Sequence, residues 1–100
     1  MIKKMKILLS SHVKLRFKER RISPSYPEKV ISSPDKIYVD NVTGYQIAIK
    51  KLLYNKRIRP MVVVYDIIGE EIHVITIYPA TDSEITNKVK KRRWLAYEKN

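Results

Sequence analysis

The chain has 100 residues, no cysteine and a formal net charge of +11 at pH 7. Its length allows one domain, over residues 1–100, with a single hydrophobic core, and the lack of cysteine excludes disulfides and thiolate metal sites. No apolar run is long enough for a membrane span or for the core of a signal peptide, so we predict a cytoplasmic protein with no membrane partner.

Basic residues are concentrated at the two ends of the chain. Residues 1–21 hold eight basic residues and one acidic residue, and residues 86–100 hold six and one, whereas residues 22–85 hold seven and eight. If the two ends meet in space, they build one positive region. Nucleic acid is the leading partner for such a field, ahead of an anionic membrane or an acidic protein.

A first helix is predicted to begin between Lys6 and Ser11 and to end by Ile22, because apolar side chains recur with the helical period over residues 8–22. Within it, His12, Arg16 and Arg20 follow at intervals of four and form one stripe, which falls inside the apolar arc of the helix. Because an unpaired charge is costly to bury, this stripe needs a partner. The partner is either an anion from outside or a carboxylate of the chain itself. The candidate carboxylates are Asp35, Asp40 and Asp66.

Two further helices are indicated by their capping signals. Ser23 followed by Pro24 opens a short second helix that ends at Ser32. The capping-box sequence over residues 81–84 opens a C-terminal helix, which we expect to extend through the aromatic residues at 94–97.

Between these helices the apolar residues alternate, which is typical of strands. We predict two strands over residues 37–40 and 45–52, joined by a turn. A basic turn over 55–60 then leads into strands over 61–68 and 71–78. The order of elements predicts an α+β fold with two N-terminal helices, a four-stranded, mainly antiparallel meander sheet and a C-terminal helix. Its helices and its sheet are expected to form one layer each.

Several motifs along residues 9–80 carry a resemblance to a known family. They are the His-x3-Arg-x3-Arg stripe of the first helix, Arg-Ile-Ser at 21–23, Ser-Pro-Asp at 33–35, Val-Val-Tyr at 63–65 and Ile-Thr-Ile-Tyr at 75–78. In these motifs and in element order the chain resembles the RelE-like toxin superfamily. It is most similar to a branch known only as a domain of unknown function, and to the related BrnT-type toxins.

This resemblance implies a toxin that acts on messenger RNA as a ribonuclease and is paired with an acidic antitoxin protein. RNA cleavage without a metal needs a base, an acid and cations that hold the charge on the phosphate. His12 could be the base or the acid, because imidazole titrates near neutrality, and Arg16 and Arg20 could hold the phosphate. We therefore predict a metal-independent endoribonuclease with His12, Arg16 and Arg20 as its catalytic residues.

Further cations and one tyrosine are predicted to extend the RNA-binding surface. They are Lys51, Arg92, Arg93 and Tyr97. No metal or other cofactor is predicted, because two histidines without cysteine give no zinc-site spacing and glycine occurs only at positions 44 and 69.

Two alternatives to a ribonuclease stay open. One is a non-catalytic module that binds nucleic acid, or that blocks a protein target as ParE-like relatives do. The other is an orphan domain of unknown function whose basic stripe is only an internal salt-bridge network, with His12 as a structural histidine that donates to a backbone carbonyl.

Overall fold

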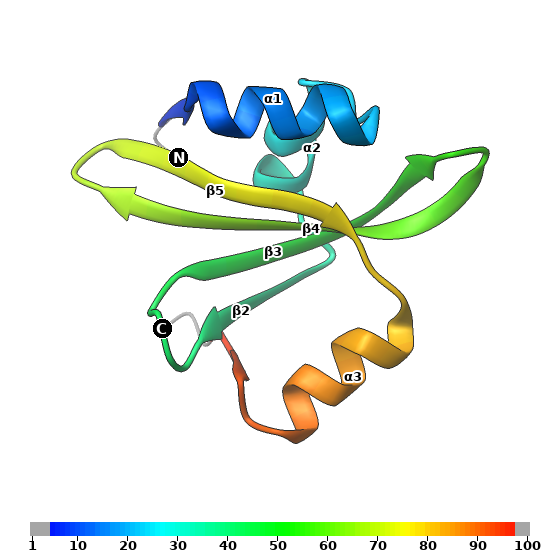
Figure 1. The fold of residues 1–100 in the computed structure, drawn as a ribbon. Helices are drawn as coiled ribbons and strands as arrows, with labels where there is room; N and C mark the ends of the chain where they lie inside the picture. Colours follow the sequence, from blue (N-terminus) through cyan, green and yellow to red (C-terminus); the bar gives the residue numbers. More distant parts are fainter. Residues whose placement is uncertain (1–4, 98–100) are drawn as a thin grey trace.

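The computed structural model describes residues 5–97, and Figure 1 shows their course. Within this range the chain forms six strands and three helices. In chain order the elements are β1 (Lys6–Leu9), α1 (Ser11–Arg20), α2 (Tyr26–Ser32), β2 (Lys36–Asp40), β3 (Gln46–Tyr54), β4 (Arg57–Ile68), β5 (Glu71–Pro79), α3 (Asp82–Lys90) and β6 (Trp94–Ala96).

The six strands form one mixed sheet in the order β1-β5-β4-β3-β2-β6. β1 runs parallel to β5, and every other neighbouring pair is antiparallel. The structure is α+β, but the predicted four-stranded antiparallel meander is wrong, because β1 and β6 add a strand at each edge. The two N-terminal helices also do not open the fold, since β1 precedes them.

β1 takes up residues that were expected in the first helix. Leu8 and Leu9 pair with His73 and Val74 of β5, a contact between distant parts of the chain that helical periodicity does not report. Ser10 then separates strand from helix, because its hydroxyl accepts a hydrogen bond from the Val13 amide at 3.2 Å and so caps α1. α1 therefore begins at Ser11, at the late end of the range predicted for its start, and ends at Arg20, before the predicted limit at Ile22.

The C-terminal helix is also shorter than predicted, and β6 follows it. α3 ends at Lys90, and Arg92 adopts a φ of 58°, which reverses the chain. Trp94 is then 3% exposed and stacks on Tyr38 with ring centroids 5.8 Å apart. Burial of this large ring stabilises a strand at the sheet edge in place of a longer helix.

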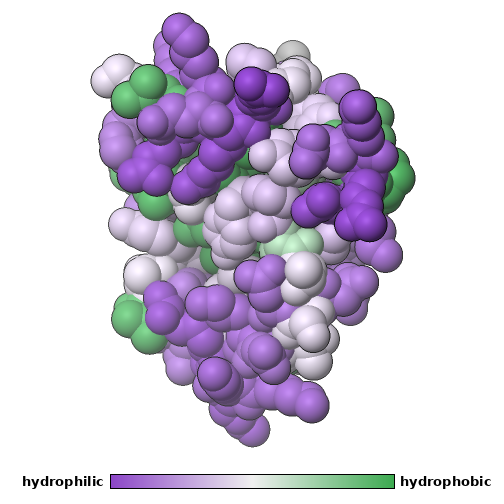
Figure 2. Space-filling view, turned by 45° about the vertical axis from the view of Figure 1, so that its right-hand side comes forward, coloured by the Kyte–Doolittle hydropathy of each residue, from purple (hydrophilic) through white to green (hydrophobic). Residues whose placement is uncertain are grey.

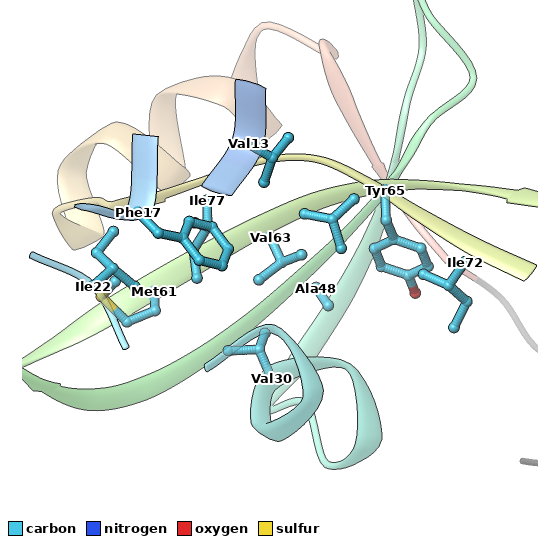
Figure 3. Close-up of a cluster of buried hydrophobic side chains, with 11 residues drawn as sticks. Val13, Phe17, Ile22, Val30, Ala48, Met61, Val63, Tyr65, Ile72 and Ile77 are labelled. Atoms are coloured by element: carbon cyan, nitrogen blue, oxygen red, sulfur yellow. The ribbon is translucent and has the colours of Figure 1, made fainter. Parts of the chain in front are cut away.

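Helices cover both faces of the sheet. α1 and α2 lie on one face and α3 on the other (Figure 1), so the prediction of a single helix layer is wrong. The physical reason is that β4, in the middle of the sheet, is apolar on both sides: Met61 and Val63 belong to the core under α1 and α2, and Val62 to the core under α3. Figure 3 shows Phe17 of α1 and Val30 of α2 converging on the first of these cores.

The other predicted elements are present with small shifts. The second helix begins at Tyr26, with Pro27 in its first turn, and the four predicted strands are β2 to β5. β4 begins at Arg57 instead of residue 61, so the basic segment before it is strand and not turn. Among residues 5–97 no helix combines the length and the apolar character that crossing a membrane requires.

Candidate nucleic-acid interface

The predicted catalytic residues lie along one flank of α1, and we call His12, Arg16 and Arg20 the α1 stripe. Val13 and Phe17 are the buried residues of this helix, whereas His12 and Arg16 are exposed. The buried face is thus narrower than the apolar arc of the sequence: Leu15, part of that arc, is 54% exposed. The prediction that the stripe points at the core is wrong for its first two residues, which lie on open surface.

Arg20, the third residue of the α1 stripe, is half-buried and bonded to the sheet. Its Nη1 donates to the carbonyl oxygen of Ile77 at 2.8 Å and, at 3.4 Å, to Oγ1 of Thr76. β1 pairs only with residues 71–74 of β5, so this guanidinium satisfies a carbonyl on the part of the strand that β1 does not reach. The hydroxyl of Tyr54 donates to the Arg20 carbonyl at 2.7 Å and ties the end of α1 to β3.

The α1 stripe has no internal counter-charge. No carboxylate among residues 5–97 forms an ion pair with it, and within the same range the His12 ring makes no hydrogen bond. Asp40 binds Arg93 instead, and Asp35 lies 4.0 Å from the Lys50 ammonium. An internal carboxylate is therefore ruled out as the partner of the stripe for the described part of the chain, and His12 and Arg16 are open to solvent and to an anion from outside.

Arg93, predicted to bind RNA, forms an ion pair with Asp40 inside the protein. Its Nε donates to both oxygens of Asp40, at 2.9 and 3.0 Å, and the amides of Val42 and Thr43 donate to the same carboxylate. Burial raises the pKa of Asp40, but the Arg93 and backbone hydrogen bonds outweigh it and lower that pKa to about 2. This pair fixes the C-terminal segment against the turn after β2.

The other predicted RNA-binding residues lie away from the α1 stripe. Lys51 lies two residues after Ile49 in β3, so the two side chains share a face of the sheet. Ile49 belongs to the core under α3, and Lys51 therefore lies on the face opposite α1. Arg92 forms the turn between α3 and β6, and its carbonyl accepts from Asn41. Tyr97 is 42% exposed and bonds through its amide to the Ile37 carbonyl of β2. The structure does not bring these residues to His12.

Within residues 5–97, the two basic ends of the chain do not merge into one region. β1 and β6 lie at opposite edges of the sheet, and α1 and α3 on opposite faces (Figure 1). Figure 2 shows hydrophilic residues over the top and the bottom of one side of the molecule, with a paler band between them. Residues 1–4 and 98–100, which belong to the predicted basic ends, lie outside the described range.

Two arginines outside the predicted site extend the cationic surface of α1. Arg57 and Arg59 precede Met61 in β4 at intervals of two residues, so the three side chains share a face of the sheet. Met61 belongs to the core under α1 and α2, and the two arginines therefore lie on the face that α1 covers. Arg57 pairs across the sheet with Tyr54, whose hydroxyl binds the end of α1. The spacing of Arg57, Arg59 and Met61 at intervals of two is the sequence signal for this strand, and the predicted turn over 55–60 is wrong from Arg57 onward.

Arg59 is the least compensated of these cations. Its Nε is buried, and it has no hydrogen-bond partner among the described residues. A buried donor without an acceptor is unusual in a folded protein and is commonly satisfied by water or by an anion. Together with the α1 stripe, Arg57 and Arg59 form what we call the cationic face, a set of four guanidinium groups and one imidazole suited to phosphate groups.

No model of a protein family matches this chain, and no curated protein and no solved structure matches it either.

Proposed function

We propose that this protein binds RNA through the cationic face and cleaves it without a metal ion, as a cytoplasmic toxin of the RelE-like type. The observation that carries the proposal is the lack of any carboxylate paired with the α1 stripe within residues 5–97. Exposed arginines without counter-ions attract a polyanion, and a net charge of +11 draws it in from a distance.

The chemistry follows from the positions of the side chains. His12 is exposed at the start of the stripe, where its imidazole could take the proton of a ribose 2′-hydroxyl or protonate the leaving 5′ oxygen. Arg16 lies one helical turn further on and supplies a fork of donors to the phosphate that links the two sugars. Arg20 is held by Ile77 through Nη1, and the guanidinium donors that this bond does not use would serve a neighbouring phosphate.

The test is cleavage of a labelled RNA in the presence of a metal chelator. We expect the wild-type protein to cut it and the His12→Ala and Arg16→Ala variants to lose cleavage. Melting temperatures should stay within a few degrees, because both side chains are exposed and bind nothing in the described structure.

His73→Ala is the matched control. His73 lies on the opposite face of β5 from its core neighbours Ile72 and Val74 and contacts Glu71 at 3.2 Å. Cleavage that persists in His12→Ala, or that disappears equally in His73→Ala, would contradict the assignment.

Binding without cleavage is the second candidate, and one observation favours it. His12 is the one imidazole that residues 5–97 place on the cationic face, whereas ribose cleavage by side chains alone calls for both a base and an acid. In this case RNA affinity falls steeply with salt and Arg16→Ala lowers the slope of log K against log salt by about 0.7, the value for one phosphate contact to a single strand. No product would form at any pH.

A further inference from the structure

α3 fits its face of the sheet less closely than α1 and α2 fit theirs. α1 and α2 each bury two side chains, whereas none of the residues of α3 is buried. Its apolar side chains are Ile85, which is partly buried, and Val89, which is 38% exposed. The capping box of Thr81 and Glu84 stabilises the start of α3, and the turn after its end leads to Arg93, which binds Asp40.

A groove of about 400 Å³ lies between α3 and the sheet. Its floor is apolar and comes from three neighbouring strands, with Tyr38 of β2, Ile49 of β3 and Pro60 of β4. Ile85 and Val89 of α3 form its wall. This volume falls within the range of protein ligand sites, and its apolar floor is the usual lining of such a site.

The apolar surface continues from the groove onto the β3–β4 hairpin. Leu53 and Ile58 are cross-strand partners and are 57% and 66% exposed. The next pair on the same face is Lys51 with Pro60, and both of these residues line the groove. The hairpin pair and the groove floor therefore form one apolar strip, and contiguous exposed apolar surface of this kind marks an interaction site.

Positive charge borders this strip. Lys36, Lys51 and Lys90 line the groove, and none of their ammonium groups binds a carboxylate within residues 5–97. Asp35 and Asp82 also line it, but Asp35 already accepts a hydrogen bond from the Lys51 amide at 2.9 Å and lies 4.0 Å from the Lys50 ammonium. The free charge at the border is mainly positive.

Charge and shape together decide among the possible occupants. A second copy of the chain would bring another +11, which opposes association. RNA would find no free ring for base stacking, because Tyr38 is 9% exposed and already stacks on Trp94. A protein segment with apolar residues along one side and carboxylates along its flanks matches both the strip and its lysine border.

We propose that the groove between α3 and the sheet, with Leu53 and Ile58 of the hairpin, docks an acidic amphipathic segment of a partner protein. Apolar side chains of the segment lie on the strip, and its carboxylates pair with Lys36, Lys51 and Lys90. Because α1 is on the opposite face of the sheet, the partner and an RNA can be bound at once (Figure 1). The inference does not depend on RNA binding or cleavage.

The test starts from a displayed library of random peptides selected on the folded, full-length protein. We expect enrichment of peptides that combine apolar and acidic residues. Synthetic copies of the enriched peptides are then titrated against variants by fluorescence anisotropy. Val89→Glu and Lys51→Glu should weaken binding about tenfold or more, a loss of about 1.4 kcal/mol.

Leu15→Glu separates docking from simple attraction to a basic protein. It places a glutamate on an exposed apolar position of α1 and changes the net charge as Val89→Glu does. We expect it to leave peptide binding unchanged, and circular dichroism melts show whether each variant is folded. Equal binding to the two variants, or no enrichment of acidic peptides, would overturn the proposal.

Two further results would also overturn it. One is a dimer in solution that Val89→Glu converts to a monomer, because the occupant would then be a second copy. The other is displacement of the bound peptide by a short RNA, because RNA would then occupy the groove. A protein that fails only the RNA assays leaves this inference standing, whereas insensitivity of peptide binding to Val89→Glu removes it and leaves the RNA proposal standing.

Discussion

The two faces of the sheet use arginine in opposite ways. On the side of α3, Arg93 binds both oxygens of Asp40, a carboxylate that is 7% exposed. On the side of α1, Arg16 is exposed without a partner among the described residues, and Arg20 binds a backbone carbonyl. In this strongly basic chain, an arginine is structural where a carboxylate is buried beside it and is available for a ligand where none is.

The largest expected effect comes from removing the ion pair of Asp40 with Arg93 on the side of α3. Asp40→Ala removes the Arg93 ion pair and leaves the amides of Val42 and Thr43 without their acceptor. We expect a loss of about 3 kcal/mol in the free energy of unfolding, measured by urea denaturation at pH 7. Asp66→Ala is the control, since the structure records no bond for that carboxylate, and an equal loss in both variants would contradict the role given to Asp40.

A smaller effect on the free energy of unfolding is expected when the pH is lowered. The pKa of Asp40 is about 2 in the folded protein against an ordinary 3.8, so its contribution to stability is complete above about pH 4 and is lost as the pH falls towards 2. The stability advantage of the wild type over Asp40→Asn should therefore shrink by about 1–2 kcal/mol across that interval. Urea titrations of both proteins at several pH values measure this difference in stability. A difference that stays constant with pH would show that the pKa of Asp40 is not lowered in the folded protein.

The smallest effects are expected on the side of α1, where the arginines have no carboxylate partner among the described residues. Arg20→Ala removes a charged donor from the Ile77 carbonyl and should cost about 1 kcal/mol of stability, whereas Arg16→Ala should change it by less than about 0.5 kcal/mol. Urea denaturation of the two variants in parallel measures the difference. If Arg16→Ala destabilised the fold as much as Arg20→Ala, Arg16 would have a structural partner and would not be available to bind a phosphate.

Local patterns in the sequence predicted the middle of the fold better than its ends. The alternation through residues 37–78 predicted β2 to β5, and the capping box at 81–84 predicted the start of α3. β1 and β6 were missed because each is short and is fixed by long-range pairing, β1 with β5 and β6 with β2. Leu8 and Trp94 carry apolar side chains that suit a helix or a strand equally, so only the tertiary contact decides.

The candidate site was predictable as a stripe but not as a surface. Spacing placed His12, Arg16 and Arg20 on one line of α1, and this line is present. Spacing could not show that Arg93 has a buried carboxylate beside it, because Asp40 is 53 residues away in sequence. The sequence does show that residues 61–68 are apolar on both faces, but local spacing does not show which helix covers which face.

The parallel pairing of β1 with β5 bears on how the chain folds during synthesis. The ribosome releases residues 6–9 early, but their partners at 71–74 come more than sixty positions later, and only then can the edge strand join the sheet. A nascent chain therefore carries an unpaired apolar segment for most of its elongation, which is the interval in which contacts with chaperones or with other nascent chains compete with native pairing.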